Sequence, residues 1–242
     1  MPRPALDRLN DRIVACERCP RLREHCRRTA EQPRASFRDE TYWGRPVPNL
    51  IPPPGDQEPV TLLMVGLAPA AHGANRTGRM FTGDRSGDFL FAAMHAVGLC
   101  NQPDARHADD ALAVHRCAIT AAAHCAPPDN KPTPAELAHC SGHLEDTFDA
   151  LPHLRSLVTL GKIAHDAALR LYKARGWITR LAAAPFAHAA EHRFHPVAGV
   201  TPPAIFCTYH PSQQNTFTGR LTPEMLEAVL TAARREADAD AS

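Results

Sequence analysis

The stretch Gly66–Asp84, with the sequence GLAPAAHGANRTGRMFTGD, decides how this chain folds. It follows an apolar run, Val60–Val65, that is typical of a buried β-strand. Gly and Pro residues then end the strand, and a helical pattern begins near Ser86. In open α/β sheets, ligands bind at such loops after the carboxyl ends of strands. The sequence therefore predicts a ligand-binding loop over residues 66–84.

A second motif stands in the same relation to a strand. YHPSQQN, at Tyr209–Asn215, directly follows the apolar run Ala204–Thr208. Both motifs are thus expected at the end of a strand, where such sheets bind their ligands. We take them as the two halves of one candidate site.

Strand and helix patterns alternate along the rest of the chain. Strands alternating with helices imply a mainly parallel sheet that is covered on both faces. We therefore expect an α/β fold, specifically a three-layer α/β/α sandwich around a mainly parallel, four-stranded sheet. The expected strands are 60–67, 117–122, 156–160 and 204–208, and the expected helices are 6–16, 87–97, 134–150, 162–175 and 223–237.

Length and composition set wider limits. The 242 residues suit one domain, 1–242, with irregular segments at 29–58 and 182–201 and an acidic tail at about 236–242. The net charge of +1 does not indicate nucleic-acid binding, although residues 1–36 hold nine Arg against five acidic residues. We see no leader and no apolar run of membrane length, so we expect a cytoplasmic monomer that binds no membrane.

The cysteines form a second strong pattern. Cys16 and Cys19 make a Cys-x-x-Cys pair, and Cys125 lies in Cys-Ala-Pro-Pro ahead of Cys140. A Cys-x-x-Cys pair alone fits half of a zinc site, a redox pair or chance. Four thiolates, however, are what a 4Fe–4S cluster needs, and the spacing before Cys140 differs from that of a zinc ribbon. The remaining cysteines are expected as buried thiols: Cys26, Cys100, Cys117 and Cys207.

Together these motifs resemble those of the uracil-DNA glycosylase superfamily, and specifically its family 5, the type B enzymes. The similarity covers roughly residues 16–224. It implies a monofunctional glycosylase of base excision repair, which removes uracil and other deaminated bases such as hypoxanthine from double-stranded DNA and leaves an abasic site. It also implies that a 4Fe–4S cluster acts as a structural staple. The cluster ligands would be Cys16, Cys19, Cys125 and Cys140.

The resemblance also assigns roles to residues of the two motifs. His210 matches the His that donates a hydrogen bond to the base oxygen. Phe81, in Gly-Arg-Met-Phe, matches the aromatic residue that stacks on the extruded base, although spacing alone favours an ordinary core aromatic. Apart from the resemblance, the backbone N–H groups along Gly66–Ala70, including those of Leu67 and Ala68, are expected to hold the carbonyl groups of the base.

Departures from other families of the superfamily place this chain in family 5. Ala68 stands where the best-known uracil enzymes have a water-binding Asp, Leu67 where family 4 has Glu, and Ala121 where both read uracil with Asn. Family 5 shares these losses, and its catalysis is linked to residues that match Asp84 and Asn130. On the sequence alone, Asp84 also fits a helix N-cap and Asn130 a turn residue.

The segment 213–220 resembles the loop that wedges into the duplex and fills the space of the flipped base. Such wedging offsets the cost of unstacking. The candidates for contact with DNA are Gln214, Asn215, Phe217 and Arg220. No Lys lies in either motif, so Schiff-base chemistry and strand cleavage are not expected.

Two other functions remain open at this stage. Ala68 in place of Asp is consistent with an inactive iron–sulfur protein that binds DNA. A small redox protein would also use a cluster, but it would need neither the loop at 66–84 nor the motif around His210.

Overall fold

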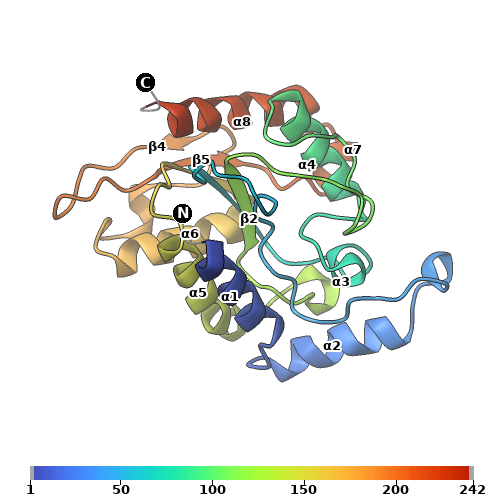
Figure 1. Ribbon diagram of the computed structural model, residues 1–242. Coiled ribbons are helices and arrows are strands. Elements are labelled where there is room, and N and C mark those ends of the chain that lie inside the picture. The colour runs from blue at the N-terminus through green and yellow to red at the C-terminus, as the bar shows by residue number, and fades with distance from the viewer. Residues whose placement is uncertain (1–2, 240–242) are drawn as a thin grey trace.

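The computed structural model describes residues 3–239 and has a five-stranded sheet at its centre (Figure 1). The strand order is β2-β1-β3-β5-β4. The first four strands of that order are mutually parallel, and β4 pairs antiparallel with β5. The strands are β1 (Leu62–Gly66), β2 (Cys117–Ala121), β3 (Ser156–Leu160), β4 (Glu191–His192) and β5 (Ala204–Thr208).

Helices cover both faces of the sheet, and every residue of the four parallel strands is buried. This is why these strands appear in the sequence as continuous apolar runs rather than alternating ones. Leu62 and Met64 of β1 pack toward one layer of helices, and Leu63 and Val65 toward the other. The first layer is α4 (Arg85–Ala96) and α8 (Pro223–Asp238), and the second is α1 (Arg3–Val14), α5 (Pro134–Asp149) and α6 (Lys162–Ala174).

The three-layer α/β/α class is therefore confirmed, but the strand count of four was wrong. The fifth strand, β4, lies within 182–201, which we expected to be irregular. Two residues are too few to show a period of two in the sequence. Residues 236–238 of the expected acidic tail belong to α8, and residues 240–242 lie outside the described part of the chain.

Helix α2 (Pro20–Glu31) was missed by the sequence analysis. It is rich in Arg and buries only Leu22, Arg23 and Cys26, so no broad apolar face marks it. Pro20 at its first turn was the available signal. The expected irregular segment 29–58 thus begins inside this helix, and it also contains a short 3₁₀ turn, Ala35–Phe37.

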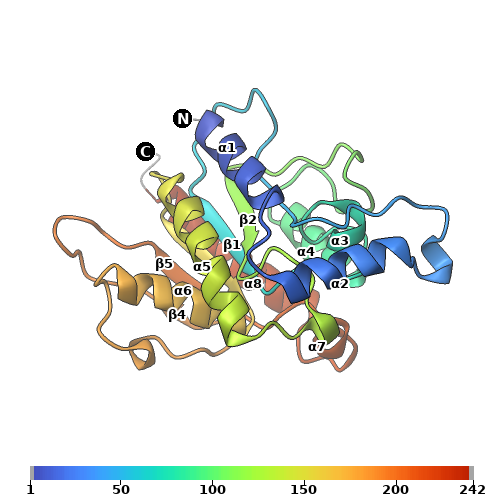
Figure 2. The ribbon, with the colours of Figure 1, turned by 90° about the horizontal axis from the view of Figure 1, so that it is seen from below.

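The carboxyl ends of the parallel strands lie at one edge of the sheet, next to the short helices α3 (Ala74–Thr77) and α7 (Gln213–Phe217). Figure 2 shows α2 extending beyond the sheet on the side of α3. Among residues 3–239, no helix has both the length and the apolar character needed to span a membrane.

Candidate active site

A cavity of about 620 Å³ opens at the carboxyl edge of the sheet. The loops that follow β1, β2 and β5 all contribute to its walls, as expected for a ligand site in an open α/β sheet. Seven of the predicted site residues line it: Leu67, Ala68, Phe81, Asp84, Asn130, His210 and Gln214. Four of the predicted substrate and DNA contacts do not line it: Gly66, Asn215, Phe217 and Arg220.

One part of the cavity wall is apolar. Leu67, Ala68 and Ala121 all line this wall. The backbone N–H groups of Ala68 and Ala70 donate no hydrogen bond within the described residues 3–239. Because both residues also line the cavity, these N–H groups are candidates for hydrogen bonds with a ligand.

Phe81 packs closely against two glycines at the cavity, Gly66 and Gly87. Its ring lies over the end of β1, where a Cβ on Gly66 would come within 2.8 Å of ring atom Cε2. Its carbonyl oxygen would lie 1.8 Å from a Cβ on Gly87. Phe81 itself has a left-handed backbone, with φ of 52°. Both glycines are therefore needed, and the ring serves the apolar core and the cavity together.

His210 faces Phe81 across the cavity. The ring centroids are 6.0 Å apart and the planes are tilted by 32°. Asn215 anchors the loop by donating from Nδ2 to the His210 carbonyl oxygen at 2.8 Å. Burial lowers the pKa of His210 from 6.5 to about 4. The imidazole is therefore neutral at pH 7 and donates a single N–H.

The low pKa of His210 predicts that its protonation state does not change near neutral pH. Between pH 6 and pH 8 the ring stays neutral in the folded protein, so base release in a single-turnover assay is expected to show no acid limb from this residue. An acid limb with a midpoint near 6.5 that disappears in His210→Gln would contradict this.

The same shift affects stability. The unfolded chain takes up a proton on His210 as pH falls from about 6.5 toward 4, and the folded chain does not. The free energy of unfolding is therefore not reduced by this histidine above pH 6.5, and it decreases as the pH falls below 6.5. His124, whose pKa burial also lowers to about 4, acts in the same direction.

Asp84 combines a structural contact with a place in the cavity wall. Its Oδ1 accepts a hydrogen bond from Gly87 N at 3.0 Å, which makes it the N-cap of α4. Its Oδ2 lies so close to Gly73 that a Cβ there would come within 2.1 Å. Burial raises its pKa, and the N–H groups of Gly87 and Ser86 oppose that shift. The N-cap alternative is thus observed, and the carboxylate also lines the cavity.

Asn130 lies at the exposed rim of the cavity. It ends the 3₁₀ turn Pro128–Asn130, and both Asp129 and Asn130 have left-handed backbones, with φ of 54° and 55°. Asn and Asp tolerate this conformation better than most residues. The turn interpretation is therefore also observed, and the turn presents the Asn130 amide at the cavity.

The four residues expected to contact DNA occupy different positions in the loop around α7. Asn215 is tied to the backbone of His210, whereas Gln214 lines the cavity. Phe217 is 68% exposed, and the Arg85 guanidinium lies 5.2 Å from its ring centroid. Arg220 lies over the Tyr209 ring at 4.4 Å.

The four expected cluster cysteines come from three segments of the chain. Cys16 follows α1, Cys19 caps α2, Cys125 follows β2 and Cys140 lies in α5. All but the half-buried Cys16 are buried. Burial, together with the neighbouring Cys19 and Cys16, raises the pKa of Cys140 to about 11. These thiols therefore lie close enough to influence one another electrostatically.

Cys26 is buried, as expected, but it belongs to the same group of thiols. It packs with Cys19, Leu22 and Cys125 in a small apolar cluster and contacts the Ala126 carbonyl oxygen at 3.7 Å. A hydrogen bond with Cys26 is the main cause of the raised pKa of Cys125. The sequence analysis did not place Cys26 beside these cysteines because helix α2 was not predicted.

Sequence reasoning also missed part of the cavity wall. The additional lining residues are Ala74, Met80, Arg85, Ser86, Asp129 and Ser212, whereas Pro69, Ala70 and Gln213 lie in stretches that the sequence already indicated. Each lies within or next to one of the recognised motifs, so position beside a motif was the available signal.

Comparison with known proteins agrees with this fold. The sequence profile described as the Uracil DNA glycosylase superfamily matches residues 52–234. This range includes the strands, the loop at 66–84 and the motif around His210. The chain therefore belongs to the uracil-DNA glycosylase superfamily.

Curated relatives narrow this assignment to one branch. A protein of Mycobacterium bovis named type-5 uracil-DNA glycosylase is 47% identical over 94% of this chain and 80% of its own length. Proteins with the same name from Thermus thermophilus and Pyrobaculum aerophilum are 44% and 42% identical. Those matches cover 92% and 99% of this chain, and 94% and 95% of the relatives' lengths.

Proposed function

We propose that this DNA glycosylase removes uracil and other deaminated bases, including hypoxanthine, from double-stranded DNA. The observation that carries the proposal is the cavity in which Phe81, Asp84 and His210 meet from loops after β1 and β5. Its volume of about 620 Å³ leaves room for a base turned out of the duplex.

The reaction breaks the bond between the base nitrogen and the sugar carbon C1′. The base leaves with the bonding electrons as an anion, and water supplies the oxygen that bonds to C1′ while its proton is released. The neutral imidazole of His210 donates its N–H toward the base oxygen on which negative charge develops. One such donor typically lowers the barrier by about 3 kcal/mol. Phe81 supplies the aromatic surface for stacking against the base.

In this proposal, Asp84 acts on the sugar and the water. A carboxylate in the cavity wall stabilises positive charge developing at C1′ and accepts a hydrogen bond from the attacking water. The N-cap contact with Gly87 fixes one of its oxygens and favours the charged form. Asn130, at the rim, provides an amide for the base or the water.

Two variants of Asp84 separate its structural and catalytic contributions. Asp84→Ser keeps an N-cap but removes the carboxylate, whereas Asp84→Ala removes both. We expect both to slow base release by at least about 10-fold, and only Asp84→Ala to lose about 1 kcal/mol of stability. Single-turnover rates and urea unfolding measure the two effects. A wild-type rate in Asp84→Ser would make Asp84 a cap alone.

Arginines near the cavity are suited to DNA phosphates. A neighbouring cavity of about 830 Å³ shares Asp84, Arg85 and Asn130 with the first and is also lined by Arg34. Arg34 and Arg85 are exposed, and phosphate contacts of this kind fix the register of a protein on DNA. Glu40, Asp88 and Asp104 also line this cavity, so acidic residues offset the arginines there, in keeping with the small net charge of the chain.

We also assign a 4Fe–4S cluster to Cys16, Cys19, Cys125 and Cys140. The donor set fits, because four thiols from three segments gather in a mostly buried place. Arg18, whose charge lowers the pKa of Cys19 and Cys140, offers a counter-charge for thiolates. The bound cluster would supply no chemistry to the reaction; it would join α2, α5 and the loop after β2.

The apolar wall predicts broad acceptance of bases. Leu67, Ala68 and Ala121 offer no side-chain hydrogen bonds, so a mismatched base leaves few buried polar groups unpaired. We expect excision of uracil opposite guanine, uracil opposite adenine and hypoxanthine opposite thymine. The mispaired uracil is expected to leave faster than the paired one, because less pairing energy opposes flipping.

Single-turnover assays on these three duplexes, side by side, test this expectation. Strict specificity for uracil would contradict it and would mean that the backbone or Asn130 reads the base edge completely. Failure to form abasic sites on all three duplexes would favour the inactive DNA-binding protein instead.

A further inference from the structure

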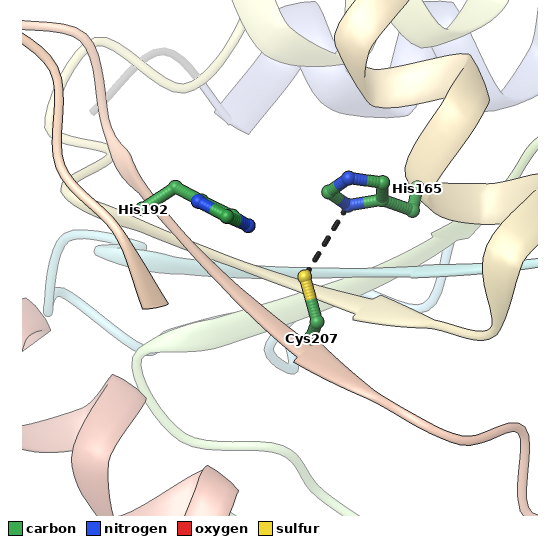
Figure 3. Close-up of side chains that lie close together, drawn as sticks. All are labelled: His165, His192 and Cys207. Atoms are coloured by element: carbon green, nitrogen blue, oxygen red, sulfur yellow. Dashed lines mark hydrogen bonds between the residues drawn. The ribbon is translucent and has the colours of Figure 1, made fainter. Parts of the chain in front are cut away.

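Two histidines and a cysteine meet on the side of the sheet covered by α6 (Figure 3). His165 comes from α6, His192 from β4 and Cys207 from β5. One potential ligand atom of each residue lies within 4.8 Å of those of the other two. None of the three lines the active-site cavity or belongs to the four-cysteine set.

The hydrogen bonds of His165 show which nitrogen is free. Its Nε2 lies 2.8 Å from the Ala184 carbonyl oxygen, which only accepts, so the proton is on Nε2. The lone pair on Nδ1 therefore faces Cys207 Sγ at 3.3 Å and Thr159 Oγ1 at 3.3 Å. Burial lowers the pKa of His165, which keeps the ring neutral at pH 7. A neutral ring whose other N–H donates to a backbone carbonyl is the usual state of a metal-binding histidine.

We propose that His165, His192 and Cys207 form a Zn²⁺ site. In a tetrahedral Zn²⁺ site with bonds of about 2.0–2.3 Å, ligand atoms lie roughly 3.3–3.8 Å apart. The distance of 3.3 Å between His165 Nδ1 and Cys207 Sγ already meets this requirement. The ligand atoms of all three residues lie within 4.8 Å of one another, so His192 needs to move only slightly closer to the other two. Two imidazoles and one thiolate are a ligand set that suits Zn²⁺.

The surroundings allow a cation to enter and to be held. His165 and Cys207 are buried, whereas His192 is half-buried and gives access from solvent. His192 Nε2 lies 3.0 Å from the Pro185 carbonyl oxygen, which orients its ring. Burial raises the pKa of Cys207 to about 11, so its thiol keeps its proton until a cation displaces it. Bound Zn²⁺ would join β4 to α6 and β5.

The alternative is a metal-free core in which the Cys207 thiol donates to His165 Nδ1. To decide between them, the cluster-containing protein is treated with a mild chelator and titrated with Zn²⁺ alone. We expect one Zn²⁺ per chain with unchanged iron content. At about 100-fold excess over Kd, Tm is expected to rise by about 5–10 °C.

Variants assign the bound ion to this site. His192→Ala is expected to lose the bound Zn²⁺ and the rise in Tm, because it removes one of three ligands. His195→Ala, an exposed histidine three residues further on, is the matched control and should bind as wild type. Cys207→Ser is a second test if it folds, read by loss of the ultraviolet charge-transfer band of a Cd²⁺–thiolate bond. Absence of retained Zn²⁺ with an unchanged Tm, or wild-type binding in His192→Ala, would overturn the proposal.

Discussion

His210→Ala is expected to slow base release by about 10²–10³-fold, the usual effect of losing one donor to a developing oxyanion. The ring of His210 faces Phe81 in the cavity, and burial keeps it neutral at pH 7. No other imidazole lines this cavity among the described residues, so no other histidine is placed to replace the donor. The measurement is a single-turnover rate on a duplex with one uracil opposite guanine.

A matched set of variants makes this result specific. His210→Asn keeps a side-chain donor and is expected to recover part of the rate. His188→Ala changes a histidine that stacks on the neighbouring Tyr209 and does not line the cavity, so the rate should stay close to wild type. All three should retain binding to an abasic product. Equal rates for His210→Ala and wild type would remove the imidazole from the mechanism.

Cys125→Ala is expected to produce a colourless protein with a much lower Tm. The wild-type protein should be brown and hold about four iron atoms per chain. Cys125 lies with Cys19 and Leu22 in a small cluster away from the two main cores, so few apolar contacts would hold this region without the metal. Because binding energy of a structural metal is folding energy, the decrease in Tm is expected to exceed about 10 °C.

Cys100→Ala provides the control for this variant. Cys100 is equally buried, but it packs in the core beneath α4 and α8 and should leave colour and iron content unchanged. Iron analysis and thermal unfolding of both variants are the measurements. A colourless wild-type protein that holds one Zn²⁺ at these cysteines would contradict the cluster assignment.

The parallel strands and the long helices were predictable because buried segments leave a recognisable pattern of apolar residues in the sequence. Ala204–Thr208 was located without error, since all five residues are buried and apolar runs mark such strands. Helix α5 starts at a capping box formed by Thr133 and Glu136, a pattern that the sequence shows directly. Helix α2 and strand β4 escaped detection, because a polar helix and a two-residue strand carry no clear period.

The candidate site was predictable as motifs but not as geometry. His210 and Phe81 were identified from their neighbours in the sequence, and the structure places them 6.0 Å apart across one cavity. Gly73 lies close to the Asp84 carboxylate and Gly87 lies close to the Phe81 carbonyl oxygen. Both contacts depend on how the loop at 66–84 folds back onto α4. The sequence contains no pattern that predicts these close contacts. The His165–His192–Cys207 group likewise arises only when β4 pairs with β5.

The most direct test of the central claim is the product formed from a duplex with one uracil. With the cluster-containing protein in excess, we predict conversion of the uracil nucleotide to an abasic site. The strand should stay intact until alkali is added, because no Lys lies in either motif to form a Schiff base. A duplex that keeps its uracil, or a strand cut before alkali treatment, would contradict the account.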